Sequence, residues 1–179
     1  MKATGIVRRV DDLGRIVIPK EIRRTFRIKE GDPLEIYTEK DGGVIFRKYS
    51  PMGDLQDFAS QMCDSIGEAT GHAAAIADRD SIIAVHGVPK RELLEKSSSQ
   101  ELEKLMRQRT IYLRRRGETR VPAVEGNEKF CLGAAVPILS QGDLMGCVML
   151  LEEGEATLDE KDQQLLKTAA GFLGKQLEQ

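Results

Sequence analysis

Basic side chains are concentrated near the N-terminus of the chain. The first 27 residues hold eight basic and three acidic residues, and seven of the eight basic residues lie between Arg8 and Arg27. A guanidinium group pairs with a phosphate or with a guanine edge through two parallel hydrogen bonds. The cluster therefore indicates a surface for duplex DNA, and the alternative is a solvated face with an excess of positive charge.

The rest of the chain has the opposite charge. The 179 residues include 27 Lys and Arg and 29 Asp and Glu, which gives a formal net charge of −2. Residues 1–50 carry a net charge of +4 and the remaining 129 residues a net charge of −6. This contrast excludes a protein that is basic over its whole surface. It indicates an N-terminal DNA-binding head, residues 1–50, followed by a part of the chain with another role.

The residues that other kinds of chemistry need are few. The three cysteines, Cys63, Cys131 and Cys147, form no C-x-x-C pair, and we expect them to be small buried hydrophobic side chains. With His72 and His86 as the two histidines, which we interpret as structural, a His-rich metal site has too few ligands. No phosphate-loop, dinucleotide or nucleophile-elbow motif occurs. We expect a protein that is not an enzyme, with no catalytic residues, metal or cofactor.

The sequence also favours a cytoplasmic location. No apolar run approaches the roughly 18 residues that a membrane span requires. The opening residues 1–4 do not resemble the start of a signal peptide. We therefore expect no membrane partner.

The arginines must be positioned by short elements. A turn at residues 11–14 separates two β-branched runs, and Pro19 suits the first turn of a helix. Residues 41–43 form a second turn signal. The order is predicted as β-β-α-β-β, with strands at 5–10 and 15–18, a helix at 20–26, and strands at 34–37 and 44–49.

A unit of about fifty residues with such short elements buries too little apolar surface to fold alone. With no disulfide or metal to add stability, association is the remaining means. We expect a two-fold dimer in which the hairpins of two chains complete each other's sheets. The dimer would display two copies of the arginine cluster about one axis.

After a linker at 51–55, the apolar spacing changes to three and four, and residues 56–179 form a second domain. Its order is predicted as α-β-β-α-β-β-α, an α+β fold around a central antiparallel sheet, with a loop at 121–128. Thr157 and Glu160 have the spacing of a capping box before the last helix. The first and last helices could pair with those of another copy.

The N-terminal sequence resembles a known family. Residues 4–24 read TGIVRRVDDLGRIVIPKEIRR and residues 28–37 read IKEGDPLEIY, which is similar to the AbrB-type transition-state regulators over about the first fifty residues. The resemblance implies a domain-swapped hairpin dimer that binds duplex DNA. It also implies that the DNA contacts fall on Arg8, Arg15, Arg23 and Arg24, with Arg9 at a basic position.

The second domain resembles a GAF sensor domain in its order of elements. The order of the two domains resembles that of a sporulation regulator of endospore-forming bacteria, which implies activation or repression of sporulation genes. If each of the two domains has its own pairing surface, we expect a homotetramer, in which dimers formed through residues 1–50 are joined by the helices of residues 56–179. A small-molecule ligand of the GAF-like domain is left open, and nothing in the sequence identifies one.

Two other functions are compatible with parts of this pattern. Similar swapped-hairpin heads occur in antitoxins, although those usually continue into a short tail rather than a full domain. Some GAF-like domains reduce methionine sulfoxide with cysteines, but Cys131 and Cys147 lie within apolar strands, where a thiolate is disfavoured.

Two further basic positions have alternative interpretations. For Arg27 we favour packing of its stem over Phe26 or pairing with a nearby glutamate. The run of residues 114–116, with Arg120, could hold an anion or DNA, and the alternative that we favour is a solvated helix end.

Overall fold

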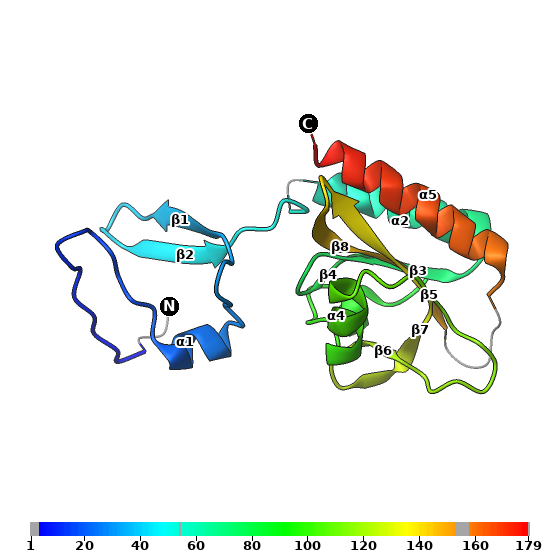
Figure 1. Ribbon diagram of the computed structural model, residues 1–179, viewed down its shortest axis with the longest axis horizontal. Coiled ribbons are helices and arrows are strands. Elements are labelled where there is room, and N and C mark those ends of the chain that lie inside the picture. Colours follow the sequence, from blue (N-terminus) through cyan, green and yellow to red (C-terminus); the bar gives the residue numbers. More distant parts are fainter. Residues whose placement is uncertain (1–3, 54, 153–157, 179) are drawn as a thin grey trace. The chain divides into compact units, whose positions relative to one another are not determined.

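The chain divides into two units, Met1–Tyr49 and Ser50–Gln179. The computed structural model describes residues 4–53, 55–152 and 158–178 (Figure 1). Within these ranges, every helix is too short or too polar to cross a lipid bilayer.

Unit 1 contains a short helix and a β-hairpin. Helix α1 spans Lys20–Thr25 and follows Pro19, whose fixed φ suits the start of a helix. The hairpin joins β1 (Leu34–Thr38) to β2 (Val44–Lys48) in antiparallel register. The helix and this second pair of strands agree with the sequence prediction.

The two strands predicted at residues 5–10 and 15–18 are not formed in the single chain (Figure 1). The backbone hydrogen bonds at the centre of this segment close only a turn: the Asp11 N–H donates to Arg15 O and the Gly14 N–H donates to Asp11 O, both at 3.0 Å. A strand needs a second strand to complete its ladder. No other described part of the same chain supplies one.

Unit 1 lacks a core. None of the side chains in residues 4–49 is buried. Val7 is 83% exposed and Val17 is 72% exposed, and the other exposed apolar side chains include Ile6, Val10, Leu13, Ile16, Phe26, Ile36 and Phe46. This is less apolar burial than a domain of about fifty residues usually achieves.

Unit 2 is built around a six-stranded antiparallel sheet (Figure 1). The strand order is β4-β3-β8-β7-β5, and β6 also pairs with β7. The strands are β3 (Ala73–Ala77), β4 (Ile82–His86), β5 (Tyr112–Leu113), β6 (Pro122–Val124), β7 (Asn127–Ser140) and β8 (Asp143–Glu152).

Helices cover both faces of this sheet. The long helices α2 (Gln56–Thr70) and α5 (Glu160–Gln176) lie side by side on one face, as Figure 1 shows. The shorter α3 (Lys90–Leu93) and α4 (Gln100–Arg107) pack against the other side. A core lies on each side of the sheet. On the side of the long helices its largest side chains include Ile76, Ile138, Leu150 and Leu166. On the side of α4 they include Phe130, Leu102, Met106 and Met149. The predicted α+β class with an antiparallel sheet is confirmed.

Several local predictions for this unit were wrong. Residues 121–128 are not a loop, because they contain β6 and the start of β7. The elements α3 and β5 were not predicted, since two to four residues are too few to show a period. Helix α5 is capped by Asp159, whose capping box is completed by Asp162. Thr157 of the predicted box lies outside the described residues.

Candidate nucleic-acid interface

Arg15 is held at the end of a tight turn. Its Nε donates to Asp11 Oδ2 at 2.8 Å, and its backbone N–H donates to Asp11 Oδ1 at 2.8 Å. The Leu13 N–H also donates to Asp11 Oδ1, at 3.0 Å, and Gly14 adopts a φ of 76° that favours glycine. These bonds, those from Arg15 first, hold the pKa of Asp11 below its ordinary value, so the carboxylate stays charged.

Arg8 and Arg9 lie on the other side of this turn. Both residues are exposed, and Arg8 Nη1 donates to the carbonyl of Val7 at 3.0 Å. Five donors sit on each guanidinium group, so the bond to Val7 leaves most of those of Arg8 available to an anion. The turn therefore places basic side chains before and after it.

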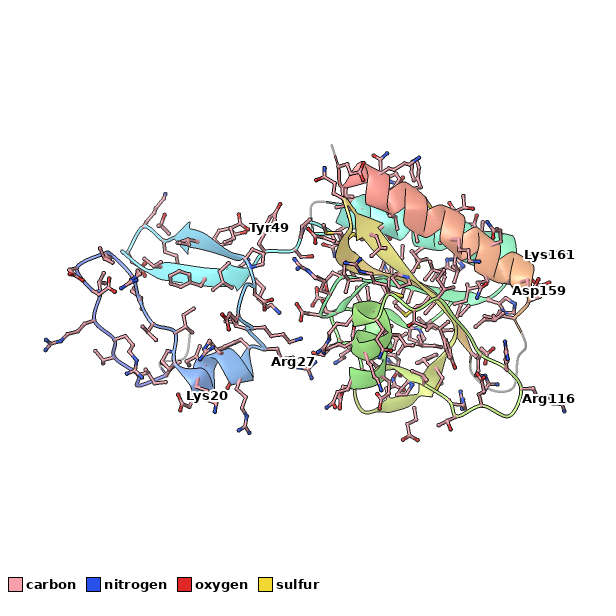
Figure 2. All side chains as sticks on the ribbon, viewed as in Figure 1. Lys20, Arg27, Tyr49, Arg116, Asp159 and Lys161 are labelled. Carbon is pink, nitrogen blue, oxygen red and sulfur yellow. The ribbon has the colours of Figure 1, made fainter. Side chains whose placement is uncertain are left out.

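Arg23 and Arg24 lie in the last turn of α1, and both are exposed. The helix ends at Thr25 with Phe26 as its C-cap, and the Ile28 N–H donates back to Arg23 O at 2.8 Å. This bond resembles a Schellman cap, with Arg27 in the left-handed region at a φ of 51°. The backbone of Arg27, labelled in Figure 2, thus ends the helix, a role that the sequence prediction for its side chain did not include.

The end of α1 is anchored to the hairpin. Lys48 Nζ donates to Arg27 O and lies 3.1 Å from Asp32 Oδ2. The Lys29 N–H donates to the same Asp32 oxygen at 2.8 Å. Burial alone would raise the pKa of Asp32, but the bonds from Lys29 and Lys48 lower it. The C-terminal end of α1 is therefore held to β2 by Lys48, which also pairs with the partly buried Asp32.

The structure places all five candidate arginines at the surface of unit 1, before and after the turn of residues 11–14 and on α1. It adds one residue that the sequence analysis did not select, Asp11. The signal was present as the Asp-x-x-Gly spacing of that turn, which was interpreted only as a chain reversal.

The second basic cluster is not a helix end. Helix α4 ends at Arg107, and Arg114 follows strand β5, where its Nε lies 2.8 Å from Glu152 Oε2. Arg120 Nη2 donates to the carbonyl of Glu152 at 3.2 Å. Arg116 lies on the loop between β5 and β6, where it is exposed (Figure 2). Two members of the cluster thus stabilise unit 2, and the favoured interpretation of a solvated helix end was wrong.

The cysteines of unit 2 are poorly suited to nucleophilic chemistry. Burial raises the pKa of Cys63 and of Cys147 to about 12, and it also raises that of Cys131. A thiol with such a pKa is almost entirely protonated at neutral pH. Among the described residues no three His, Cys, Asp or Glu side chains gather as a metal site. His86 Nδ1 lies 2.9 Å from Asp64 Oδ1, which agrees with a structural role.

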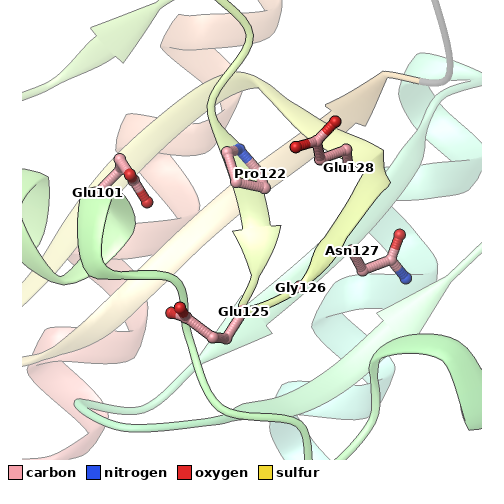
Figure 3. Close-up of a pocket in the computed structure, with 6 residues that line it drawn as sticks. All are labelled: Glu101, Pro122, Glu125, Gly126, Asn127 and Glu128. Carbon is pink, nitrogen blue, oxygen red and sulfur yellow. The ribbon is translucent and has the colours of Figure 1, made fainter.

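The face of the sheet under α4 is packed with side chains. Phe130, Leu102 and Met106 fill it and are 0–1% exposed. A surface pocket of about 440 Å³ beside it is acidic rather than apolar, as Figure 3 shows. Its lining residues are Glu101, Pro122, Glu125, Gly126, Asn127 and Glu128.

Comparison with known proteins assigns both units. Residues 54–178 match the family described as stage V sporulation protein T C-terminal, transcription factor, and residues 7–54 match the family of the bacterial antitoxin MazE. The chain is 48% identical to stage V sporulation protein T of Bacillus subtilis (strain 168) over the full length of both. It is 41% identical to the transition state regulatory protein AbrB of the same organism, over 49% of this chain and 81% of that protein.

Several solved structures are similar to this chain in fold. The GAF domain from an Acinetobacter phosphoenolpyruvate-protein phosphotransferase superposes with a TM-score of 0.54 at 15% identity, covering 73% of this chain and 84% of that one. The type II free methionine-R-sulfoxide reductase from Thermoplasma acidophilum gives a TM-score of 0.51 at 14% identity, over 70% and 96% of the two chains. At these identities the likeness establishes the GAF fold of unit 2. With the full-length sequence match, it shows that the chain belongs to the stage V sporulation protein T family of transcription factors.

Proposed function

We propose that this chain is a cytoplasmic regulator of sporulation genes that binds duplex DNA through an intertwined dimer of residues 1–50. The DNA contacts of the proposal are Arg8, Arg9, Arg15, Arg23 and Arg24. The observation that carries it is that residues 4–49 combine these exposed arginines with no buried side chain. The antitoxin alternative accounts only for the match over residues 7–54, whereas the transcription-factor match covers the rest of the chain.

The apolar surface of unit 1 supports a second copy as its partner. Residues 5–10 and 15–18 have the β-branched composition of strands but no ladder partner among the described residues of their own chain. On the hairpin, Ile36 lies opposite Phe46, and the two are 61% and 42% exposed. A second copy would supply both the missing strands and the missing apolar contacts, and this would close the exposed edges.

Unit 2 supports a second pairing surface. The rings of Phe58 on α2 and Phe172 on α5 lie 5.6 Å apart, and Phe172 is 44% exposed. Two copies could pack these helices into a bundle, which would join two DNA-binding dimers into a tetramer. Neither catalysis nor a small-molecule ligand is part of the proposal, because the thiols are held protonated and the face under α4 is filled.

Sedimentation and DNA titration test the proposal. The fragment of residues 1–53 is expected to sediment as a dimer and to bind duplex DNA. If a dimer neutralises six to eight phosphates, the logarithm of its association constant should fall with the logarithm of salt concentration with a slope of about −5 to −7. A folded monomer, or a fragment that does not bind duplex DNA at low salt, would contradict the proposal.

A further inference from the structure

The carboxylate of Asp11 is bonded to the Nε edge of the Arg15 guanidinium. Asp11 Oδ2 accepts from Nε at 2.8 Å, so Nε is engaged and the remaining donors of the guanidinium are those of its two terminal amino groups, Nη1 and Nη2. The Arg15 side chain is 69% exposed, so these groups are open to a partner. The guanidinium can therefore approach a ligand end-on through Nη1 and Nη2, but not side-on through Nε.

An exposed ion pair alone would be a weak constraint. Here the carboxylate is itself fixed, because its other oxygen accepts the N–H groups of Leu13 and Arg15 at 3.0 and 2.8 Å. The Asp11 N–H also donates to Arg15 O at 3.0 Å. Asp11 is thus hydrogen-bonded to both the backbone and the side chain of Arg15. The pKa of Asp11 is lowered by these same bonds, so the charge is present at neutral pH.

A carboxylate beside a DNA-binding arginine has a second effect. It repels every phosphate that approaches, so it weakens binding to any duplex regardless of sequence. Specificity is the difference between the affinities for the specific site and for any other duplex. A group that orients an arginine toward a base edge raises the first affinity, and its negative charge lowers the second. An end-on guanidinium matches the two acceptors of guanine, O6 and N7, in the major groove.

We propose that Asp11 is a positioning residue that directs Arg15 end-on toward a guanine edge and thereby sets the sequence selectivity of the head. This inference rests on the proposed function. It distinguishes Arg15, as a reader of bases, from arginines that contact only phosphates.

The neighbouring Asp12 provides a matched control. It carries the same charge, is exposed and follows Asp11 directly. Asp11→Asn keeps an oxygen acceptor for the turn but loses the charge that holds Nε, whereas Asp12→Asn removes a charge without altering that bond. Both variants should bind a scrambled duplex more tightly than the wild type, because each removes one repulsive charge.

The experiment measures selectivity with the full chain. The wild type first enriches a duplex from a random pool, and each variant is then titrated with that duplex and with a scrambled duplex of equal composition. Asp11→Asn should lower the ratio of the two affinities about tenfold, the effect of one good arginine–guanine contact. Asp12→Asn should leave the ratio unchanged. The mass of the oligomer should be that of the wild type in both variants.

A double variant separates positioning from a general structural role. In the background of Arg15→Ala, Asp11→Asn should change the ratio no further, because Asp11 acts through Arg15. A further fall in that background, or equal ratios for Asp11→Asn and Asp12→Asn, would overturn the inference while leaving DNA binding intact. If the wild type enriches no duplex at all, the proposed function fails, and this inference fails with it.

Discussion

The Nε atom of Arg114 lies 2.8 Å from Oε2 of Glu152, and the two side chains are 8% and 1% exposed. The pair crosses the sheet beside Gly133, where an added Cβ would lie 2.7 Å from Glu152 Cγ. Burial raises the pKa of Glu152, and the charges of Arg114 and Arg120 oppose the rise. An arginine from the most basic run of unit 2 therefore links the end of β8 to the segment after β5, across the intervening strand β7.

Removing one partner of this pair should destabilise unit 2. Arg114→Met leaves the Glu152 carboxylate buried without its cation, so the free energy of unfolding should fall by about 3 kcal/mol in urea titrations. The double variant Arg114→Met/Glu152→Leu should recover most of the loss. Arg115→Met, at the exposed next position, should stay within about 0.5 kcal/mol of the wild type. An Arg114→Met variant as stable as this control would show that the ion pair contributes nothing.

Two glycines of α5 should respond in opposite directions to the same substitution. An added Cβ at Gly174 would lie 2.1 Å from the Leu139 carbonyl oxygen, so Gly174→Ala must push the helix away from β7. We expect a loss of about 2 kcal/mol or more. Gly171 has no atom within 4 Å of the same position, so Gly171→Ala should raise stability by about 0.5 to 1 kcal/mol. Thermal unfolding of the two variants compares them directly, and equal effects would contradict the close packing of α5.

The Asp32–Lys48 pair should make unit 1 sensitive to acid. The pKa of Asp32 in the folded state lies below its ordinary value of 3.8, so its stabilising contribution is present above that value and is lost as the pH falls below it. In the 1–53 fragment, the difference in Tm between the wild type and Asp32→Asn should be clear at pH 7 and should narrow below about pH 4. The control Glu30→Gln, at an exposed position, should show little difference at either pH. A constant difference for Asp32→Asn would mean that its charge does not matter.

Replacing single arginines of the head should weaken DNA binding without changing assembly. Arg15→Ala and Arg23→Ala should each cost about 1 to 3 kcal/mol of binding free energy in a fluorescence titration. Lys40→Ala removes a charge from the hairpin turn and should have a smaller effect. The sedimented mass should stay constant in all three variants. Loss of the oligomer in Arg15→Ala or Arg23→Ala would instead assign that residue a structural role.

A charge at Phe172 should separate the proposed tetramer into dimers. Phe172→Glu puts a carboxylate on the apolar face of α5 and should halve the mass measured by light scattering. Gln164→Glu introduces the same charge at an exposed position two turns earlier in the helix, rotated about 80° from Phe172, and should leave the mass unchanged. A tetramer that persists in Phe172→Glu would exclude this helix face as the second interface.

The sequence predicted best those elements whose pattern is long. Helices α2 and α5 and strands β7 and β8 have ten or more residues each, so their apolar spacing is unambiguous. Strands β5 and β6 have two and three residues and show no period. The strands expected at residues 5–10 and 15–18 have the right composition but no ladder partner in the part of the chain that the structure describes. Composition alone does not show which strand would pair with them.

The candidate site was predictable in its residue types but not in its contacts. The arginine positions followed from charge and family resemblance. The bond between Asp11 and Arg15 depends on the geometry of one turn, which local spacing suggests but does not determine. The contact between Arg114 and Glu152 joins residues 38 positions apart, so no local pattern could have separated Arg114 from its exposed neighbours.

The absence of any buried side chain in residues 4–49 has a consequence for dosage in the cell. In the proposed dimer the interior of residues 1–50 is completed by a second copy, so the fraction of chains able to bind DNA would obey mass action and rise faster than the total amount of protein. DNA binding would then show a threshold in protein concentration. At low expression most chains would remain monomeric and exposed to proteolysis, and a modest increase in expression would convert many of them into dimers that bind DNA.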